Sequence, residues 1–149
     1  VQRGVAEIIA ADRSFDAEGF LKGALMAHER VVEAFASGDR AELKALLGPE
    51  VYAAFDGALA SRERAGLTAH SVFVKQMPAQ MVAAALKGRN AEIDVRYESE
   101  MIQFSKNAAG EVVEGSESAV KRVVDRWTWL RDVRAGDPNW KLVDTDHGD

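Results

Sequence analysis

All three tryptophans of the chain fall within residues 123–143, a stretch that reads as one β-hairpin. Side chains alternate between the two faces of a strand, so Asp125, Trp127, Trp129 and Arg131 share one face. Two indoles on one face are typical of a strand that packs into the interior of a domain. The segment therefore predicts a core hairpin whose inner face also carries an acid and a base.

The turn of this hairpin is predicted at residues 136–139, which read Gly-Asp-Pro-Asn. Proline fixes φ near −65°, while glycine and asparagine tolerate positive φ, so the tetrapeptide favours a chain reversal. Trp140 and Leu142 then run back antiparallel to the first strand.

Hydrophobic periodicity divides the rest of the chain into a helical half and a strand half. Apolar residues recur at helical spacing within about 5–11, 16–35, 39–47 and 49–66. They alternate within about 70–77, 81–86, 93–104 and 120–133, with a short strand or loop near 112 and a phase slip near 99–101 that suggests a bulge. Helices followed by an antiparallel meander predict an α+β domain, with N-terminal helices packed on a curved sheet. Such a domain is cone-shaped, like nuclear transport factor 2 or the cystatin-like folds.

Bulk composition excludes several classes of function. The chain has 149 residues, which suits one domain, and its lack of cysteine excludes disulfides and thiol catalysis. A net charge of −5 argues against nucleic acid as a partner. The longest apolar stretch, near 77–86, is shorter than the roughly 20 residues of a membrane-spanning helix. No signal peptide is visible, and a start at Val1 reads as a fragment or a processed form.

No catalytic, cofactor or metal set emerges from the spacing of the polar residues. The three histidines are scattered and show none of the spacings of a metal site. Asp125 beside the tryptophans has the setting of a general base with a raised pKa. A structural role is favoured instead, in which Asp125 pairs across the sheet with a residue such as Arg96 or Glu98.

A candidate pocket follows from the aromatic residues, which should meet between the helices and the sheet. Such a pocket would take an acyl chain, a lipid or a hydrophobic peptide segment. Its expected lining residues are Phe35, Phe55, Phe73, Tyr97, Asp125, Trp127, Trp129 and Arg131.

Two further features suggest contact with a membrane surface. Val5, Ile8 and Ile9 form the apolar side of a short amphipathic segment that could lie in a bilayer interface. A local basic patch for anionic lipid is a second expectation, built from Arg62, Arg64, Lys87 and Arg89.

Several motifs, taken in order, resemble the Tim44-like domain family. The C-terminal pair is D-x-W-T-W-x-R-D at 125–132 followed by D-P-N-W-x-L at 137–142. Upstream lie F-L-K-G-A from residue 20, E-A-F-A-S-G-D at 33–39, L-K-x-L-L-x-P-E-V-Y at 43–52 and A-E-I-D-V-R-Y at 91–97. The likeness runs from about Asp16 to Thr145, which gives a leader helix at 1–15 and a single domain at 16–146.

The resemblance implies a non-enzymatic, membrane-associated adaptor of preprotein translocation. Its expected partners are translocation or membrane-assembly proteins and anionic lipid, and no cofactor is expected. The expected location is peripheral, at a bacterial or mitochondrial inner membrane. Two alternatives remain open from the residues: a small-molecule enzyme that uses Asp125 in a tryptophan-lined pocket, and a carrier of a hydrophobic ligand.

Overall fold

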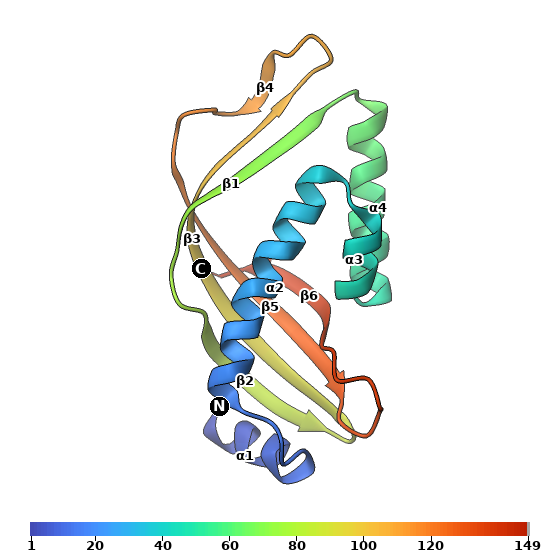
Figure 1. Ribbon diagram of the computed structural model, residues 1–149, viewed down its shortest axis with the longest axis vertical. Coiled ribbons are helices and arrows are strands. Elements are labelled where there is room, and N and C mark those ends of the chain that lie inside the picture. Colours follow the sequence, from blue (N-terminus) through green and yellow to red (C-terminus); the bar gives the residue numbers. More distant parts are fainter. Residues whose placement is uncertain (149) are drawn as a thin grey trace.

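The computed structural model describes residues 1–148, in which four helices precede six strands of one antiparallel sheet (Figure 1). The helices lie against one face of this sheet, so the predicted α+β class is confirmed. The helices are α1 (Gln2–Ala11), α2 (Ala17–Ser37), α3 (Arg40–Leu46) and α4 (Pro49–Arg64). The strands are β1 (Thr68–Gln76), β2 (Gln80–Lys87), β3 (Asn90–Lys106), β4 (Val112–Gly115), β5 (Lys121–Asp132) and β6 (Lys141–His147).

The helix ends follow the capping chemistry of the sequence. The carboxylates of Asp16 and Asp39 accept hydrogen bonds from the backbone N–H of Gly19 and Glu42, each at 3.1 Å, and so cap α2 and α3. Gly38 ends α2 with a φ of 76°, which glycine adopts without a Cβ penalty. The prediction of these helix boundaries is confirmed.

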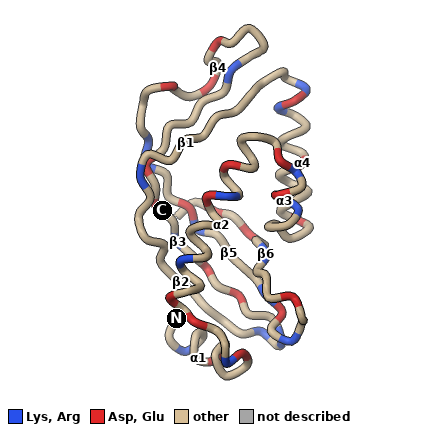
Figure 2. The backbone as a smooth tube through the Cα atoms, in the orientation of Figure 1, with Lys and Arg blue, Asp and Glu red and all other residues tan. Residues whose placement is uncertain are grey.

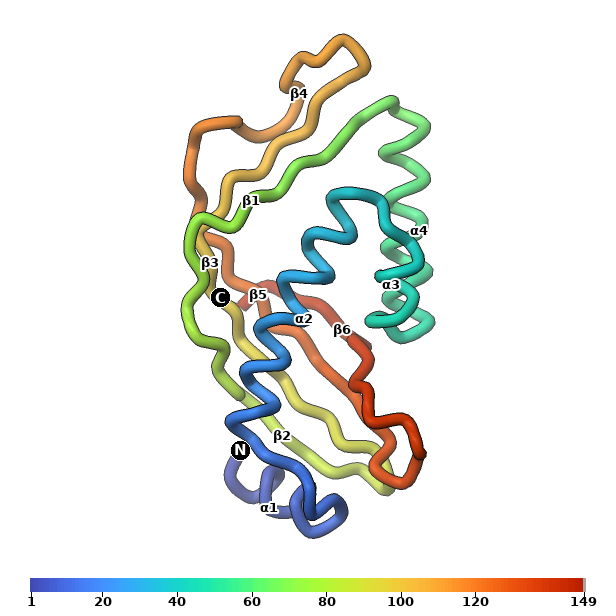
Figure 3. The backbone as a smooth tube through the Cα atoms, in the orientation of Figure 1, coloured from blue at the N-terminus to red at the C-terminus, as the bar shows by residue number. Residues whose placement is uncertain are grey.

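The long strand β3 organises the sheet. β1 and β2 lie end to end along one edge of β3, while β5 and β4 lie along the other edge and β6 pairs with β5 (Figure 3). Pro78 falls in the link between β1 and β2, where its missing N–H costs the sheet no hydrogen bond. The cross-strand pairs Ile93–Trp129 and Tyr97–Asp125 fix the register of the central strands.

The sheet is irregular near residues 99–101, as predicted, but the extra residue lies on the neighbouring strand and not on β3. β3 pairs with β5 without interruption from Asn90 to Met101. Against β1 the register shifts between Phe73 and Lys75, which face Met101 and Glu100, so Val74 is the extra residue. A bulge needs the additional residue on only one strand, and here the long central strand stays regular while its partner absorbs the irregularity.

The two faces of the sheet have opposite character. The inner face of β3 is buried at every second residue from Ala91 to Met101. Charged residues of both signs are interspersed along the strands (Figure 2). On the outer face they form cross-strand pairs such as Arg126 with Asp94 at 2.8 Å. Arg122 pairs in the same way with Glu98.

Two expectations about charged residues are wrong: one ion pair and one basic patch. Asp125 cannot pair with Arg96 or Glu98, because Asp125 lies opposite Tyr97 on the inner face while those two residues point outward. The predicted basic patch of Arg62, Arg64, Lys87 and Arg89 does not form either. Two of them lie in the last turn of α4 and two at the β2–β3 turn, at opposite ends of the molecule (Figure 1).

Candidate functional site

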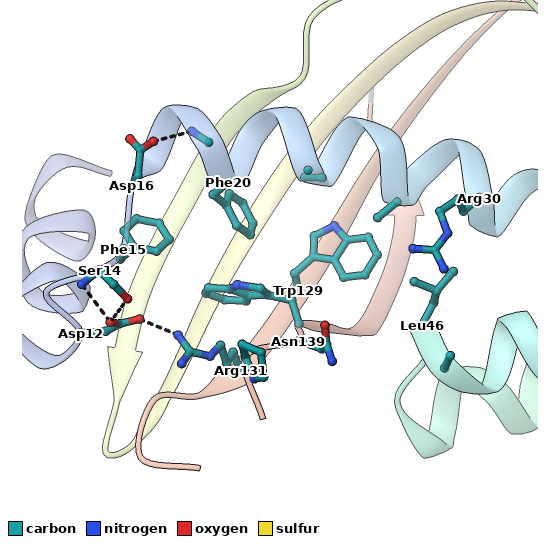
Figure 4. A pocket seen from close by; sticks show the side chains of 17 residues that line it. Asp12, Ser14, Phe15, Asp16, Phe20, Arg30, Leu46, Trp129, Arg131 and Asn139 are labelled. Carbon is teal, nitrogen blue, oxygen red and sulfur yellow. Dashed lines mark hydrogen bonds and ion pairs between the residues drawn. The ribbon is translucent and has the colours of Figure 1, made fainter. Parts of the chain in front are cut away.

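A groove of about 680 Å³ runs along α2, between that helix, α3 and the β5–β6 hairpin. This volume lies within the range typical of small-molecule sites. The close-up in Figure 4 shows aromatic rings on its walls and charged groups at its two ends. The lining residues are Asp12, Ser14, Phe15, Asp16, Gly19, Phe20, Gly23, Ala24, Ala27, Arg30, Ala45, Leu46, Trp129, Arg131, Pro138, Asn139 and Trp140.

Three aromatic rings form the end of the groove near α1. Phe20 meets the edge of Trp140 at a centroid distance of 4.8 Å, and Phe15 lies 5.9 Å from Phe20 and 6.1 Å from Trp140. The cap residue Asp16 explains this geometry, because Phe15 precedes the cap and Phe20 is the fourth helical residue. A hydrophobic residue before the cap packs on the fourth residue of many helices.

Small residues of α2 leave the groove open. Gly23, Ala24 and Ala27 line the helix side, and a Cβ added at Gly23 would meet no atom within 4 Å. Larger side chains at these positions would fill the space between α2 and the hairpin. The cavity therefore depends on small helical residues as well as on the aromatic walls.

Three of the four charged side chains that line the groove form ion pairs, and the fourth, Asp16, caps α2. Arg131 donates to Asp12 at 2.5 Å, and the side chains of both residues are largely buried. Hydrogen bonds from Ser14 and then from Arg131 hold the pKa of Asp12 below its ordinary value. At the other end Arg30 pairs with Glu42, and the side chain of Arg30 is 55% exposed. The groove thus presents an apolar interior in which Arg131 and Asp12 neutralise each other, with the exposed Asp16 at one end and the exposed Arg30 at the other.

Only two of the residues expected to line a pocket line this groove. Trp129 and Arg131 come from β5, as the alternation of that strand requires. The sequence interpretation missed Phe15, Phe20 and Trp140. The aromatic residue just before the cap at Asp16 was the signal that could have identified the first two.

Four of the other expected residues surround His28 of α2 instead. The His28 ring stacks on Tyr97 at 4.2 Å and lies 4.4 Å from Trp127 and 5.8 Å from Phe73. Its Nε2 lies 3.1 Å from the Asp125 carboxylate, while the side chain of His28 is only 1% exposed. Asp125 is therefore a partner of a buried histidine and lies outside the groove.

A hydrogen-bond chain ties this cluster to the groove wall. Trp129 donates through Nε1 to the Tyr97 hydroxyl at 2.9 Å, and that hydroxyl donates to the backbone carbonyl of Ala24 at 2.9 Å. Burial raises the pKa of Tyr97 above its ordinary value. The chain fixes the orientation of Trp129 and the distance between α2 and the sheet.

The remaining two expected residues pack away from the groove. Phe35 and Phe55 meet at 4.9 Å between α2 and α4, and the Arg62 guanidinium lies 5.3 Å from the centroid of the Phe35 ring. They stabilise the contact between two helices, with a cation–π contribution from Arg62.

The predicted membrane-contact residues of α1 differ in accessibility. Ile8 is fully buried in the core, where α1 packs on β2, so it cannot touch a bilayer while α1 stays docked. Val5 is half-buried and Ile9 is 38% exposed. Gly4 permits the close approach of α1 to β2, since a Cβ at this position would lie 1.8 Å from the carbonyl oxygen of Ala84.

Residues 1–148 contain neither a membrane-spanning helix nor a cluster of metal ligands. No helix in that range is long and apolar enough to span a bilayer. Nor does that part of the chain bring three histidine, aspartate or glutamate side chains together as a metal site would require.

Comparison with known proteins identifies the family. The family model of the Tim44-like domain matches residues 1–147. The human mitochondrial import inner membrane translocase subunit TIM44 is 25% identical over 143 residues, a match that covers 94% of this chain and 32% of that protein. The chain therefore spans about a third of that relative's length.

A solved structure has a similar fold at low sequence identity. The intermembrane space region of the chloroplast protein ARC6 superposes with a TM-score of 0.58 and 10% identity, covering 85% of this chain and 95% of that one. The family match extends over nearly the whole chain, including the capped helices and the tryptophan hairpin that frame the groove. The chain belongs to the Tim44-like domain family.

Proposed function

We propose that this chain is a non-enzymatic adaptor domain that works at a membrane surface in protein translocation. In this proposal the groove along α2 takes up an acyl chain of an anionic lipid and so attaches the domain peripherally to an inner membrane, bacterial or mitochondrial. The observation that carries the proposal is the groove, with its aromatic walls and its paired charges.

The chemistry of the groove suits an acyl chain. Phe15, Phe20 and Trp140 offer apolar surface at one end, and burial of such surface contributes about 25 cal/mol per Å². Arg131 and Asp12, the largely buried charges of the groove, neutralise each other, while Asp16 is exposed and caps α2. A lipid tail between the rings would therefore desolvate no unpaired ion as long as Asp16 stays in contact with water.

The charge at the open end suits a phosphate. Among residues 1–148 the exposed side chain of Arg30 pairs with Glu42 alone, and exposed ion pairs are typically worth about 0.2–1 kcal/mol. A lipid phosphate can replace that carboxylate at little cost. The relation to the TIM44 translocase subunit supports a protein-transport role, with translocation proteins as partners.

Flotation with liposomes tests the proposal. The domain should float with cardiolipin-containing vesicles, more strongly at low salt, and weakly with phosphatidylcholine alone. Gly23→Leu fills the groove and should abolish flotation, whereas the matched control Gly57→Leu on α4 should float like the wild type. At both positions an added Cβ would meet no atom within 4 Å, and leucine has a higher helix propensity than glycine. Both variants should therefore fold. Equal flotation of the two variants would exclude the groove.

The alternative of a small-molecule enzyme has one supporting observation, the pair formed by His28 and Asp125. Enclosure of His28 by three aromatic rings argues against it, because a proton-transfer group must reach its substrate. The carrier alternative uses the same groove. Native mass spectrometry of the domain purified from cells distinguishes a carrier, which retains an acyl species in solution, from an adaptor that meets lipid only in the bilayer.

A further inference from the structure

The strand β1 has one free edge within the described part of the chain. It pairs with β3 on one side, and no other strand of residues 1–148 pairs with its second side. Alternate residues of an edge strand direct their N–H and C=O groups away from the sheet, where they can pair with another chain. Val72 and Val74 are each about half exposed on this strand, at 52% and 51%.

A hollow of about 370 Å³ accompanies this edge. It lies between β1 and the C-terminal half of α2, which run side by side in Figure 1. Its strand side is formed by residues 68–72 and its helix side by Glu33, Ala36 and Ser37. An edge strand beside a helix with a hollow between them is the arrangement in which extended peptides add to sheets in PDZ and PTB domains.

The helix side of the hollow carries the carboxylate of Glu33, with Glu29 one turn earlier on α2. Partial burial, together with the nearby charge of Glu29, raises the pKa of Glu33 above its ordinary value. Among residues 1–148 neither carboxylate forms an ion pair. A cationic side chain placed in the hollow would relieve this repulsion.

We propose that β1 is a docking edge for an extended, basic segment of a partner protein. The segment adds as a strand to β1 and places lysine or arginine side chains beside Glu33, with small apolar side chains beside Val72. Backbone hydrogen bonds supply affinity without sequence specificity, and the carboxylates select for positive charge. This edge is separate from the groove that binds lipid in the proposed function.

A second copy of the chain fits this edge less well. Two copies paired through β1 would bring Glu29 and Glu33 of each chain to the same interface. Like charges facing each other across an interface are costly. A basic partner segment satisfies both the free backbone and the charge.

The test uses a fluorescein-labelled nine-residue peptide of alternating lysine and valine, titrated with the full chain at low salt and followed by fluorescence anisotropy. Two further versions carry N-methyl groups, one on every lysine amide and one on every valine amide. Only one set of alternate amides can face β1, so one version should bind at least about ten-fold more weakly than the parent peptide. The other version should stay within about two-fold of the parent.

Protein variants test the charge contribution. Glu33→Gln should weaken binding about two- to five-fold, as expected for one exposed ion pair, while the matched control Glu50→Gln on α4 should leave it unchanged. Absence of saturable binding at millimolar peptide, or equal affinity of the two methylated versions, would overturn the proposal. A dimer in light scattering that Val72→Lys dissolves would also overturn it, since a second copy would then occupy the edge.

Discussion

Tyr97→Phe removes a single oxygen atom from the junction between α2 and the sheet. That hydroxyl accepts a hydrogen bond from Trp129 and donates one to the carbonyl of Ala24, both at 2.9 Å. Loss of the bond to the Ala24 carbonyl costs about 1 kcal/mol, and leaving the indole N–H of Trp129 buried without a partner costs about 1–3 kcal/mol. Trp129 is only 2% exposed, so water cannot replace the lost acceptor. We expect the free energy of unfolding to fall by about 2–4 kcal/mol.

Urea unfolding followed by tryptophan fluorescence measures this loss. The midpoint should fall while the m-value stays constant, because the phenylalanine variant buries the same surface. Tyr52→Phe is the matched control, since that half-buried ring forms no side-chain hydrogen bond with residues 1–148, and its stability should change by less than about 0.5 kcal/mol. A Tyr97→Phe variant as stable as this control would refute the role assigned to the hydrogen-bond chain.

Three further perturbations have definite expected outcomes. Stability should decline as pH rises above about 10, because the unfolded state then loses the Tyr97 proton while the folded state retains it, and Tyr97→Phe should flatten this decline in unfolding midpoints. Gly4→Ala should detach α1 from β2, because the added Cβ would collide with the Ala84 carbonyl. Amide hydrogen exchange in α1 should become faster, and unchanged protection would contradict this expectation. Asp16→Ala should lower the free energy of unfolding by about 1 kcal/mol through loss of the α2 cap, with Asp16→Asn as the conservative control in calorimetry.

Local signals in the sequence were sufficient to predict most of the secondary structure. The caps at Asp16 and Asp39 and the stop at Gly38 act within a few residues, so their chemistry can be recognised without coordinates. Alternation along β5 likewise placed Trp127 and Trp129 on the inner face, as observed. The phase slip near residue 100 indicated the place of the irregularity, but it could not show that the extra residue, Val74, lies on β1.

The site was harder to predict because it depends on contacts distant in the sequence. Arg131 meets Asp12 across 119 positions, and Asp125 meets His28 across 97. Strand alternation shows which face a residue occupies but not which part of α2 covers it. The aromatic residues were therefore assigned to one pocket, whereas the structure divides them among the groove, the His28 cluster and the contact between Phe35 and Phe55.

Quenching of tryptophan fluorescence by brominated lipid tests the central claim most directly. Cardiolipin with bromine at mid-chain brings a contact quencher only to indoles that touch the acyl chain. Because the partly exposed Trp140 lines the groove, we expect quenching in the wild type and in Gly57→Leu, and its loss in Gly23→Leu. Vesicle binding without quenching, or equal quenching in both leucine variants, would show that the lipid chain does not enter the groove and would contradict the account.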